Sequence, residues 1–455
     1  MKKNSIYFVL IALMLSSCGI YRKYQHTTDV PDGLYGNITD SVVDSTGIGN
    51  LSWHEVFSDP ALQTLIDSAL VRNTDLQIAH LRVKEAEAAL LSARLSYLPS
   101  LSLAPEGSVN KLEGSKVTQA YSLPATASWE IDIFGRQTNA KRQSQAVYAQ
   151  SKEYVQAVRT QLVAAVANYY YTLLMLDAQL EISLSTEDTW RESVETTRAM
   201  KKAGMVTEAA LSQTEATYYR ISASVLDLKE QINQVENAMS SLLADVPHSI
   251  VRGKLEGQQL PEHLAVGIPL QMLSYRPDVR SAEFALAEAF YTTNAARAAF
   301  YPAVTLGGSV GWTNNAGGAI TNPGQFLVSS VASLVQPLFN RGQNIARLRI
   351  AKARQEEAKL SFEQTLLDAG GEVNDALTQY QTARDKALYF EKQVASLQNA
   401  VRSTDLLMKH GNVTYLEVLT ARQTLLDAQL SQVANRFMEI QGVITLYQAL
   451  GGGRM

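Results

Sequence analysis

The sequence ARLSYLPSLSL at residues 93–103 decides the fold, because it returns at residues 296–306 as ARAAFYPAVTL. Two further pairs follow in the same order. FGR at 134–136 returns as FNR at 339–341, and KAGMVT at 202–207 returns as KHGNVT at 409–414. A fixed order at nearly constant spacing is the signature of an internal repeat. We therefore interpret the chain as two copies of one unit.

The composition is that of a folded protein without a surface for nucleic acid. Of the 455 residues, 46% are hydrophobic and 18% are charged, and 40 basic residues against 44 acidic ones give a net charge of −4. A nucleic-acid-binding domain instead gathers an excess of Lys and Arg on one face. We expect no nucleic-acid partner.

The N-terminus has the form of an export signal. Two lysines at positions 2 and 3 precede an apolar run from Ile6 to Leu15, which is too short to span a bilayer. The following LSSC is similar to a lipobox, in which Cys18 becomes the lipidated first residue of the mature protein; an ordinary signal peptide with an incidental cysteine is the alternative. Cys18 is the only cysteine, so neither an intramolecular disulfide nor a cysteine-based metal site can form.

The sequence of each half predicts a helix that is followed by a strand. In the first half, Pro60 begins a helix that runs to about Tyr97, and a strand follows from Pro99. In the second half, the motif Arg276-Pro277-Asp278 begins a helix that ends before Pro302, where the next strand starts.

Two more predicted strands follow from alternation with a period of two. From Tyr121 to Ile133 apolar residues occupy every second position, and the strand after Pro302 alternates in the same way to Thr313. A fourth strand is predicted from 326 to 334, and the stretches 106–116 and 314–323 are rich in turn residues. Segments of about ten residues suit tilted transmembrane strands, whereas a hairpin at the end of a soluble bundle is the alternative.

The helices after the strands are unusually long. The segment 136–202 would extend about 100 Å at 1.5 Å per residue, which only a bundle or coiled coil supports. Gly204 and Gly411 permit the chain to reverse at the far ends. We divide the chain into a signal peptide (1–17), a lead segment (18–57), a first repeat (58–245), a linker (246–276), a second repeat (277–450) and a tail (451–455).

Four strands cannot enclose an aqueous lumen, and an open sheet edge in lipid leaves backbone groups unpaired. Three copies would supply twelve strands, an even number within the bacterial range. The face with Tyr121 and Trp129 would contact lipid, and these residues together with Trp312 would form aromatic girdles. We therefore predict an α+β membrane protein in which a trimeric 12-stranded β-barrel is continued by a long antiparallel coiled-coil α-barrel.

These features together resemble the TolC-type outer-membrane efflux family, in particular its lipoprotein branch, which works with resistance-nodulation-division pumps. The shared elements are the lipobox at Cys18, the Arg276-Pro277-Asp278 motif, the proline-started strands and the two turns around Gly204 and Gly411, which we call the first and second tips. The resemblance implies a homotrimer in the outer membrane that extends into the periplasm. It also implies two partners, a periplasmic adaptor protein and an inner-membrane resistance-nodulation-division transporter.

The resemblance also implies roles for residues at the tips. The adaptor would contact Gly204, Met205, Val206 and Thr207 at the first tip and Gly411, Asn412, Val413 and Thr414 at the second. The alternative for these glycines is a plain turn without a partner. Such channels often carry a ring of aspartates after the second tip, but Thr420 stands at that position, with Glu417 one turn earlier. Glu417 is either part of a gate or a solvated helix carboxylate.

The sequence predicts neither an enzyme nor a cofactor or metal site. The string Gly-Gly-Ser-Val-Gly at 307–311 matches the hydrolase pattern, which requires a sharp turn before a helix, but here it continues a strand. The six histidines lack metal-ligand spacing. The leading hypothesis is an efflux duct for drugs or other small toxic solutes. A duct for protein or peptide export and a periplasmic coiled-coil tethering lipoprotein are the alternatives.

Overall fold

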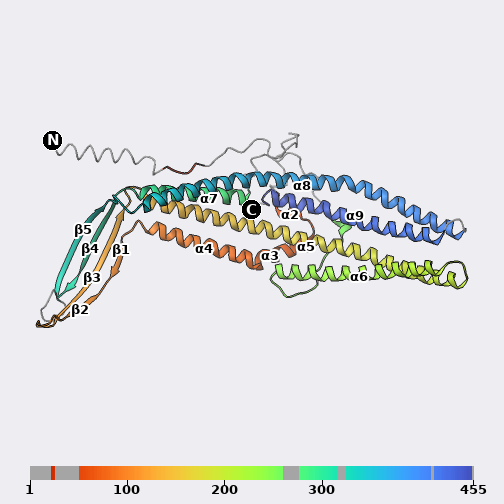
Figure 1. Ribbon diagram of the computed structural model, residues 1–455, viewed down its shortest axis with the longest axis horizontal. Helices are drawn as coiled ribbons and strands as arrows, with labels where there is room; N and C mark the ends of the chain where they lie inside the picture. The colour runs from red at the N-terminus through yellow and green to blue at the C-terminus, as the bar shows by residue number, and fades with distance from the viewer. Residues whose placement is uncertain (1–21, 26–50, 260–275, 315–323, 411–413, 453–455) are drawn as a thin grey trace. The chain divides into compact units, whose positions relative to one another are not determined.

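The computed structural model (Figure 1) describes residues 22–25, 51–259, 276–314, 324–410 and 414–452. These residues form two compact units. Of these residues, 22–25, 80–154 and those between 280 and 365 belong to the first unit, and the others belong to the second. The signal peptide, Cys18 and the second tip's Gly411, Asn412 and Val413 lie outside the described residues.

The first unit contains an antiparallel sheet. Its strands are β1 (Ser100–Leu103), β2 (Glu106–Asn110), β3 (Thr118–Ile131), β4 (Ala303–Thr313) and β5 (Gln325–Val335). The strand order is β1-β3-β4-β5, so the two repeats meet in the middle of the sheet (Figure 1). The strands predicted from the second half agree with β4 and β5 to within one residue at each end.

The prediction of turn structure throughout 106–116 is wrong at its start. β2 occupies 106–110 and pairs with β3, which begins at Thr118 and is therefore longer than the alternation suggested. Ser122 lies opposite Glu106 on one side and opposite Thr313 on the other, so β2 continues the edge formed by β1. Ala104, which lies between β1 and β2, donates its backbone N–H to Pro124 O of β3 at 3.1 Å. β1 and β2 thus form one edge strand, which is interrupted at Pro105 because proline has no N–H to donate.

The single helix predicted from Pro60 to Tyr97 is also wrong, because two helices, α3 (Pro60–Arg72) and α4 (Thr74–Leu95), occupy this stretch. Asn73 separates them with an extended ψ of 127°. Its side-chain oxygen accepts the N–H of Leu76 at 3.0 Å, which caps α4, and its amide donates to Leu242 O at 2.9 Å. The break therefore stabilises the start of one helix and fastens it to the end of another.

The second unit contains most of two long helical hairpins, and the first helix of each hairpin begins in the first unit (Figure 1). The first consists of α5 (Arg136–Lys202) and α6 (Glu208–Leu242), and the second of α8 (Gln343–Lys409) and α9 (Tyr415–Ala449). α5 and α8 have 67 residues each, and α6 and α9 have 35 each. Equal lengths support the interpretation as a duplication. The remaining described elements are α2 (Trp53–Val56), η3 (Leu255–Gly257) and α7 (Pro277–Ala298).

The core of the second unit lies along the middle of α5. Val166, Tyr170 and Leu173 are completely buried there, at the spacing of one helical face. Phe57 stacks edge-to-face on Tyr447 of α9, with ring centroids 5.6 Å apart, and brings the lead segment into this core. Among the described helices, none combines the length and the apolar character that a bilayer-spanning helix needs.

Candidate functional site: an exposed sheet and two helical tips

The register of the sheet places apolar side chains on one face. Residues directly opposite each other in a sheet lie on the same side, and the apolar positions of β3 pair with apolar or small ones of β4: Leu123 with Trp312, Ala125 with Val310, Ala127 with Gly308 and Trp129 with Leu306. β1 and β5 extend the same face with Leu101, Phe326 and Val328. This face is solvent-exposed in the single chain; Leu101, for example, is 80% exposed.

The aromatic residues named from the sequence lie toward the two ends of this face. The indole N–H of Trp129 donates to Tyr97 O at 2.8 Å, near the end where the helices join. Trp312 packs edge-to-face on Phe326 at 5.7 Å, six positions away along the β3–β4 ladder. The N–H of Tyr121 donates to the side chain of Asn314 at 2.6 Å at that same far end. At about 3.4 Å per residue, the band between Trp129 and Trp312 is about 20 Å tall.

The opposite face of the sheet is rich in small hydroxyl side chains. Ser102, Thr126, Ser309 and Ser329 stand opposite one another in a row that crosses all four strand positions. The hydroxyls of Ser102 and Thr126 lie 2.6 Å apart, and those of Ser309 and Ser329 lie 2.7 Å apart. Ser309 belongs to the hydrolase-like string, which lies wholly within β4 and forms no turn before a helix. One face is therefore suited to lipid and the other to water.

The two edges of the sheet are open in the described chain. β1 and β2 form one edge and β5 forms the other, and neither edge is paired with a further described strand. Every residue of β5 is exposed, although Phe326, Val328 and Leu334 are apolar. An exposed, apolar edge strand is a template for pairing with another chain.

The first helical tip is a tight turn between α5 and α6. Gly204 has a φ of +71°, and Met205 N donates back to Met200 O at 2.9 Å, as in a Schellman motif. Thr207 caps α6 by accepting the N–H of Ala210 at 3.3 Å. Met205 is 70% exposed, so the turn presents an apolar side chain to solvent.

At the second tip, Thr414 and Glu417 form a capping box at the start of α9. The hydroxyl of Thr414 donates to the Glu417 carboxylate at 3.1 Å. Thr420 is exposed, and its hydroxyl donates to Leu416 O at 2.9 Å on its own helix. The structure thus assigns Glu417 a local structural role that the sequence analysis did not foresee, although the S/T-x-x-E signature at 414–417 could have revealed it.

Comparison with known proteins agrees with this architecture. The family model described as "Outer membrane efflux protein" matches residues 65–245 and 268–452, one match for each repeat. The chain belongs to the outer membrane efflux protein family. It is an outer-membrane channel of an efflux system, and the predicted fold class and location are confirmed.

Similar proteins can be aligned with most or nearly all of the chain. The cation efflux system protein CusC of Escherichia coli K12 is 31% identical over 97% of this chain and 98% of its own. The probable outer membrane lipoprotein SilC of Salmonella typhimurium is 29% identical over 88% of each chain. The open state of the Neisseria gonorrhoeae MtrE outer membrane channel superposes with a TM-score of 0.85 and 29% identity, over 95% of this chain and 97% of that one.

The two hairpins of the efflux channel are joined near their tips by contacts that the sequence analysis missed. Tyr415 at the start of α9 donates its hydroxyl to Ser193 O on α5 at 3.1 Å, and Arg422 donates to the Ser193 hydroxyl at 2.9 Å. Arg422 also pairs with Asp405 on α8. Beneath them, Trp190, Ile221, Leu419 and Leu426 form a buried cluster with Tyr415. The first and second repeats of the channel are thus held together close to the tips.

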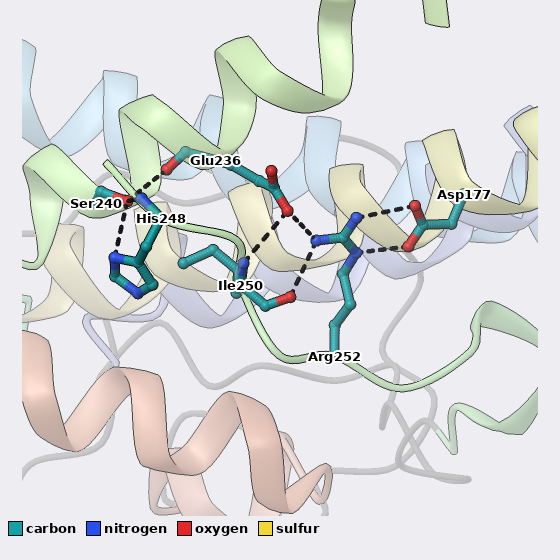
Figure 2. A network of polar contacts seen from close by, with 6 residues as sticks. All are labelled: Asp177, Glu236, Ser240, His248, Ile250 and Arg252. Carbon is teal, nitrogen blue, oxygen red and sulfur yellow. Dashed lines mark hydrogen bonds and ion pairs between the residues drawn. The ribbon is translucent and has the colours of Figure 1, made fainter. Parts of the chain in front are cut away.

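A partly buried arginine fastens the described part of the linker to the first hairpin (Figure 2). Arg252 donates from two nitrogens to Asp177 on α5, at 2.5 and 3.0 Å, and from the third to Glu236 on α6 at 2.5 Å. Glu236 also accepts the N–H of Ile250 at 3.2 Å. The hydrogen bonds to Asp177 raise the pKa of Arg252, so it stays charged.

Arg276 of the Arg-Pro-Asp motif plays the same part in the second repeat. Its buried guanidinium donates to Asp278 and Glu372 at 2.6 Å each and to Ala449 O, also at 2.6 Å. Burial alone would raise the pKa of Asp278, but the hydrogen bond and charge of Arg276 lower it below its ordinary value. The motif therefore joins the start of α7 to α8 and α9.

The structure offers no site for a metal cofactor within its described residues. No group of three or more His, Cys, Asp or Glu side chains lies close enough together there to hold an ion.

Proposed function

We propose that three copies of this channel close their sheets into one 12-stranded barrel through the outer membrane. The observation that carries the proposal is a sheet with one exposed apolar face and two open edges. Neither edge can remain unpaired in lipid, and closure with neighbouring copies pairs every backbone group. The apolar face with its girdle of Tyr121, Trp129 and Trp312 contacts lipid, and the hydroxyl-lined face surrounds the lumen.

The channel is a passive duct without an enzymatic step. It receives small toxic solutes from a periplasmic adaptor and a resistance-nodulation-division transporter of the inner membrane, which supplies the energy. CusC is a cation efflux protein, so metal cations are the first solutes to test. Cys18 carries the lipid anchor, in keeping with SilC, which is described as a probable outer membrane lipoprotein.

Native mass spectrometry and planar-bilayer recordings test the central proposal. We expect a mass of three chains in detergent and discrete conductance steps after reconstitution. A stable monomer that stays in solution without detergent and does not conduct would refute it. Modification of Ser309→Cys with a charged thiol reagent should reduce the conductance, whereas modification of the matched Val310→Cys on the other face should not.

The tips dock on the adaptor through Met205 and the residues around it. A photo-crosslinking residue at position 205 should capture the adaptor in native membranes. The same residue at Tyr219, which is 64% exposed on α6 below the tip, is the control. Equal capture at both positions would argue against a tip-specific contact.

The second tip carries the gate, with Glu417 and Thr420 near its narrowest point. Because Glu417 also caps α9, Glu417→Gln is a sharper test than Glu417→Ala, since glutamine retains the capping box but removes the charge. We expect a changed single-channel conductance in Glu417→Gln. Unchanged conductance would leave Glu417 with its capping role alone.

A further inference from the structure

The first turns of α8 carry an unusual concentration of positive charge. Arg347, Arg349, Lys352 and Arg354, which we call the basic segment, lie on α8 before its first acidic residue, Glu356. All four are exposed. None forms an ion pair or a hydrogen bond through its side chain with another residue that the structure describes.

The equivalent helix of the first repeat shows the same asymmetry. α5 has no acidic residue from Arg136 to Lys152, although it carries four cations there, and acidic residues become frequent only further along the helix. The cations of α5, however, are engaged: Arg136 pairs with Glu130, Lys141 lies over the ring of Tyr97, and Lys152 lies over the ring of Tyr148. Of these two helix starts, only the basic segment of α8 leaves its charges without a partner among the described residues.

The position of the basic segment suggests what that partner is. α8 begins at Gln343, shortly after β5 ends at Val335. At 1.5 Å per residue, the four cations lie about 6–17 Å along the helix from its start. Lipid headgroups extend only several ångströms beyond the hydrocarbon, but long side chains reach toward them, and the attraction acts over about 8 Å at physiological salt.

We propose that the basic segment binds the headgroups of anionic phospholipids at the membrane surface next to the sheet. This inference rests on the proposed function, in which the apolar face of the sheet meets lipid. Charge complementarity and continuity with that apolar face favour phospholipid over a soluble anion or a neighbouring protein. Guanidinium groups suit the phosphate oxygens, since they donate two parallel hydrogen bonds. The segment would hold anionic lipid around the channel and fix the depth of the sheet in the bilayer.

A matched pair of fourfold variants tests the inference. The first replaces Arg347, Arg349, Lys352 and Arg354 with glutamine. The control replaces Arg384, Lys386, Lys392 and Arg402, four exposed cations further along the same helix, where acidic residues are interspersed. Purified trimers are mixed with phosphatidylglycerol or chain-matched phosphatidylcholine, and native mass spectrometry counts the bound lipids. Electrostatic attraction of this kind predicts that the preference for phosphatidylglycerol falls on the order of tenfold in the first variant only.

Three results would overturn the inference. The first is an equal preference for phosphatidylglycerol in both variants. The second is a change in the ratio of anion to cation permeability without a change in lipid binding, which would mean that the segment faces the lumen. The third is dissociation of the first variant into monomers, which would place the segment between copies. Wild-type conductance is recorded in parallel; its absence would refute the proposed duct, whereas altered lipid binding in a conducting channel bears on the basic segment alone.

Discussion

The sheet and the helical hairpins use the same apolar residue types in opposite ways. On the sheet, Leu101 is 80% exposed and Phe326 is 62% exposed, whereas Leu173 and Trp190 on α5 are 0% and 2% exposed. The hairpins bury their apolar residues against one another, which is the usual solution in water. The sheet leaves its apolar residues for an outside medium. The difference shows that the helical hairpins suit an aqueous environment, whereas the apolar face of the sheet suits a lipid environment.

The treatment of charge follows the same division. In the hairpin region Arg276 is buried and Arg252 is partly buried, and each is paired with two carboxylates. On the sheet, the alternation leaves the apolar face without a charge, and Glu130 pairs with Arg136 where the helices begin. In the hairpins, charged residues are therefore neutralised by ion pairs. On the sheet they stay near the end where the helices begin, which leaves the apolar face free of charge, as contact with hydrocarbon requires.

Truncation of one leucine in each region should give the largest contrast. Leu173→Ala leaves a cavity in a closed core, and we expect it to lower the free energy of unfolding by about 2–5 kcal/mol. Leu101→Ala removes an exposed side chain and should change the free energy by less than about 0.5 kcal/mol in detergent. Urea titrations of both variants provide the measurement. Similar losses at the two sites would contradict the comparison.

Placement of a charge on either face of β4 tests the assignment of the two solvents. Val310→Arg puts the charge on the apolar face, where we expect a cost of about 2–4 kcal/mol near the middle of a bilayer. Ser309→Arg, one residue earlier on the hydroxyl face, should assemble at nearly the wild-type level. Trimer yield in the outer-membrane fraction reports both. Equal yields would mean that the apolar face does not meet lipid.

Alanine at the first tip should have a smaller effect. Gly204→Ala meets no neighbouring atom, but its φ of +71° is unfavourable for a residue with a Cβ, at a cost of about 1 kcal/mol. Gly257→Ala has equal space and an ordinary φ, so it should be neutral or slightly stabilising. Thermal unfolding of the two variants separates strain from packing. A neutral Gly204→Ala would show that the tip can adopt another turn.

The smallest effect is expected from pH. The pKa of Asp278 is lowered from 3.8 by Arg276, so this carboxylate stabilises the fold above that value, and the contribution disappears as the pH falls through the folded pKa. Because Asp278 is partly exposed, we expect a contribution of about 0.5–1 kcal/mol. Asp278→Asn should therefore show a flatter dependence of stability on pH below about 4. A slope equal to that of wild type would rule out this linkage.

Much of this fold could be predicted because its signals are periodic and repeated. The alternation from Val304 to Trp312 and the helical pattern from 136 to 202 each follow from local geometry alone, and the structure bears out both. The break at Asn73 was not predicted, since one polar residue in a helical pattern is ordinary and its contact with the carbonyl of Leu242 joins residues far apart in sequence. The same holds for Ser193, whose partners come from the other repeat.

The sequence by itself determined the duplication, the helix and strand types and the unequal faces of the sheet, because these depend on residue spacing along the chain. Only the tertiary structure decided which charged residues form ion pairs, which strand continues the edge of the sheet and which residues join the two repeats. Those features depend on contacts between residues far apart in sequence. Arg252 shows the reason: its partly buried charge is compensated by Asp177 and Glu236, which come from two different helices (Figure 2).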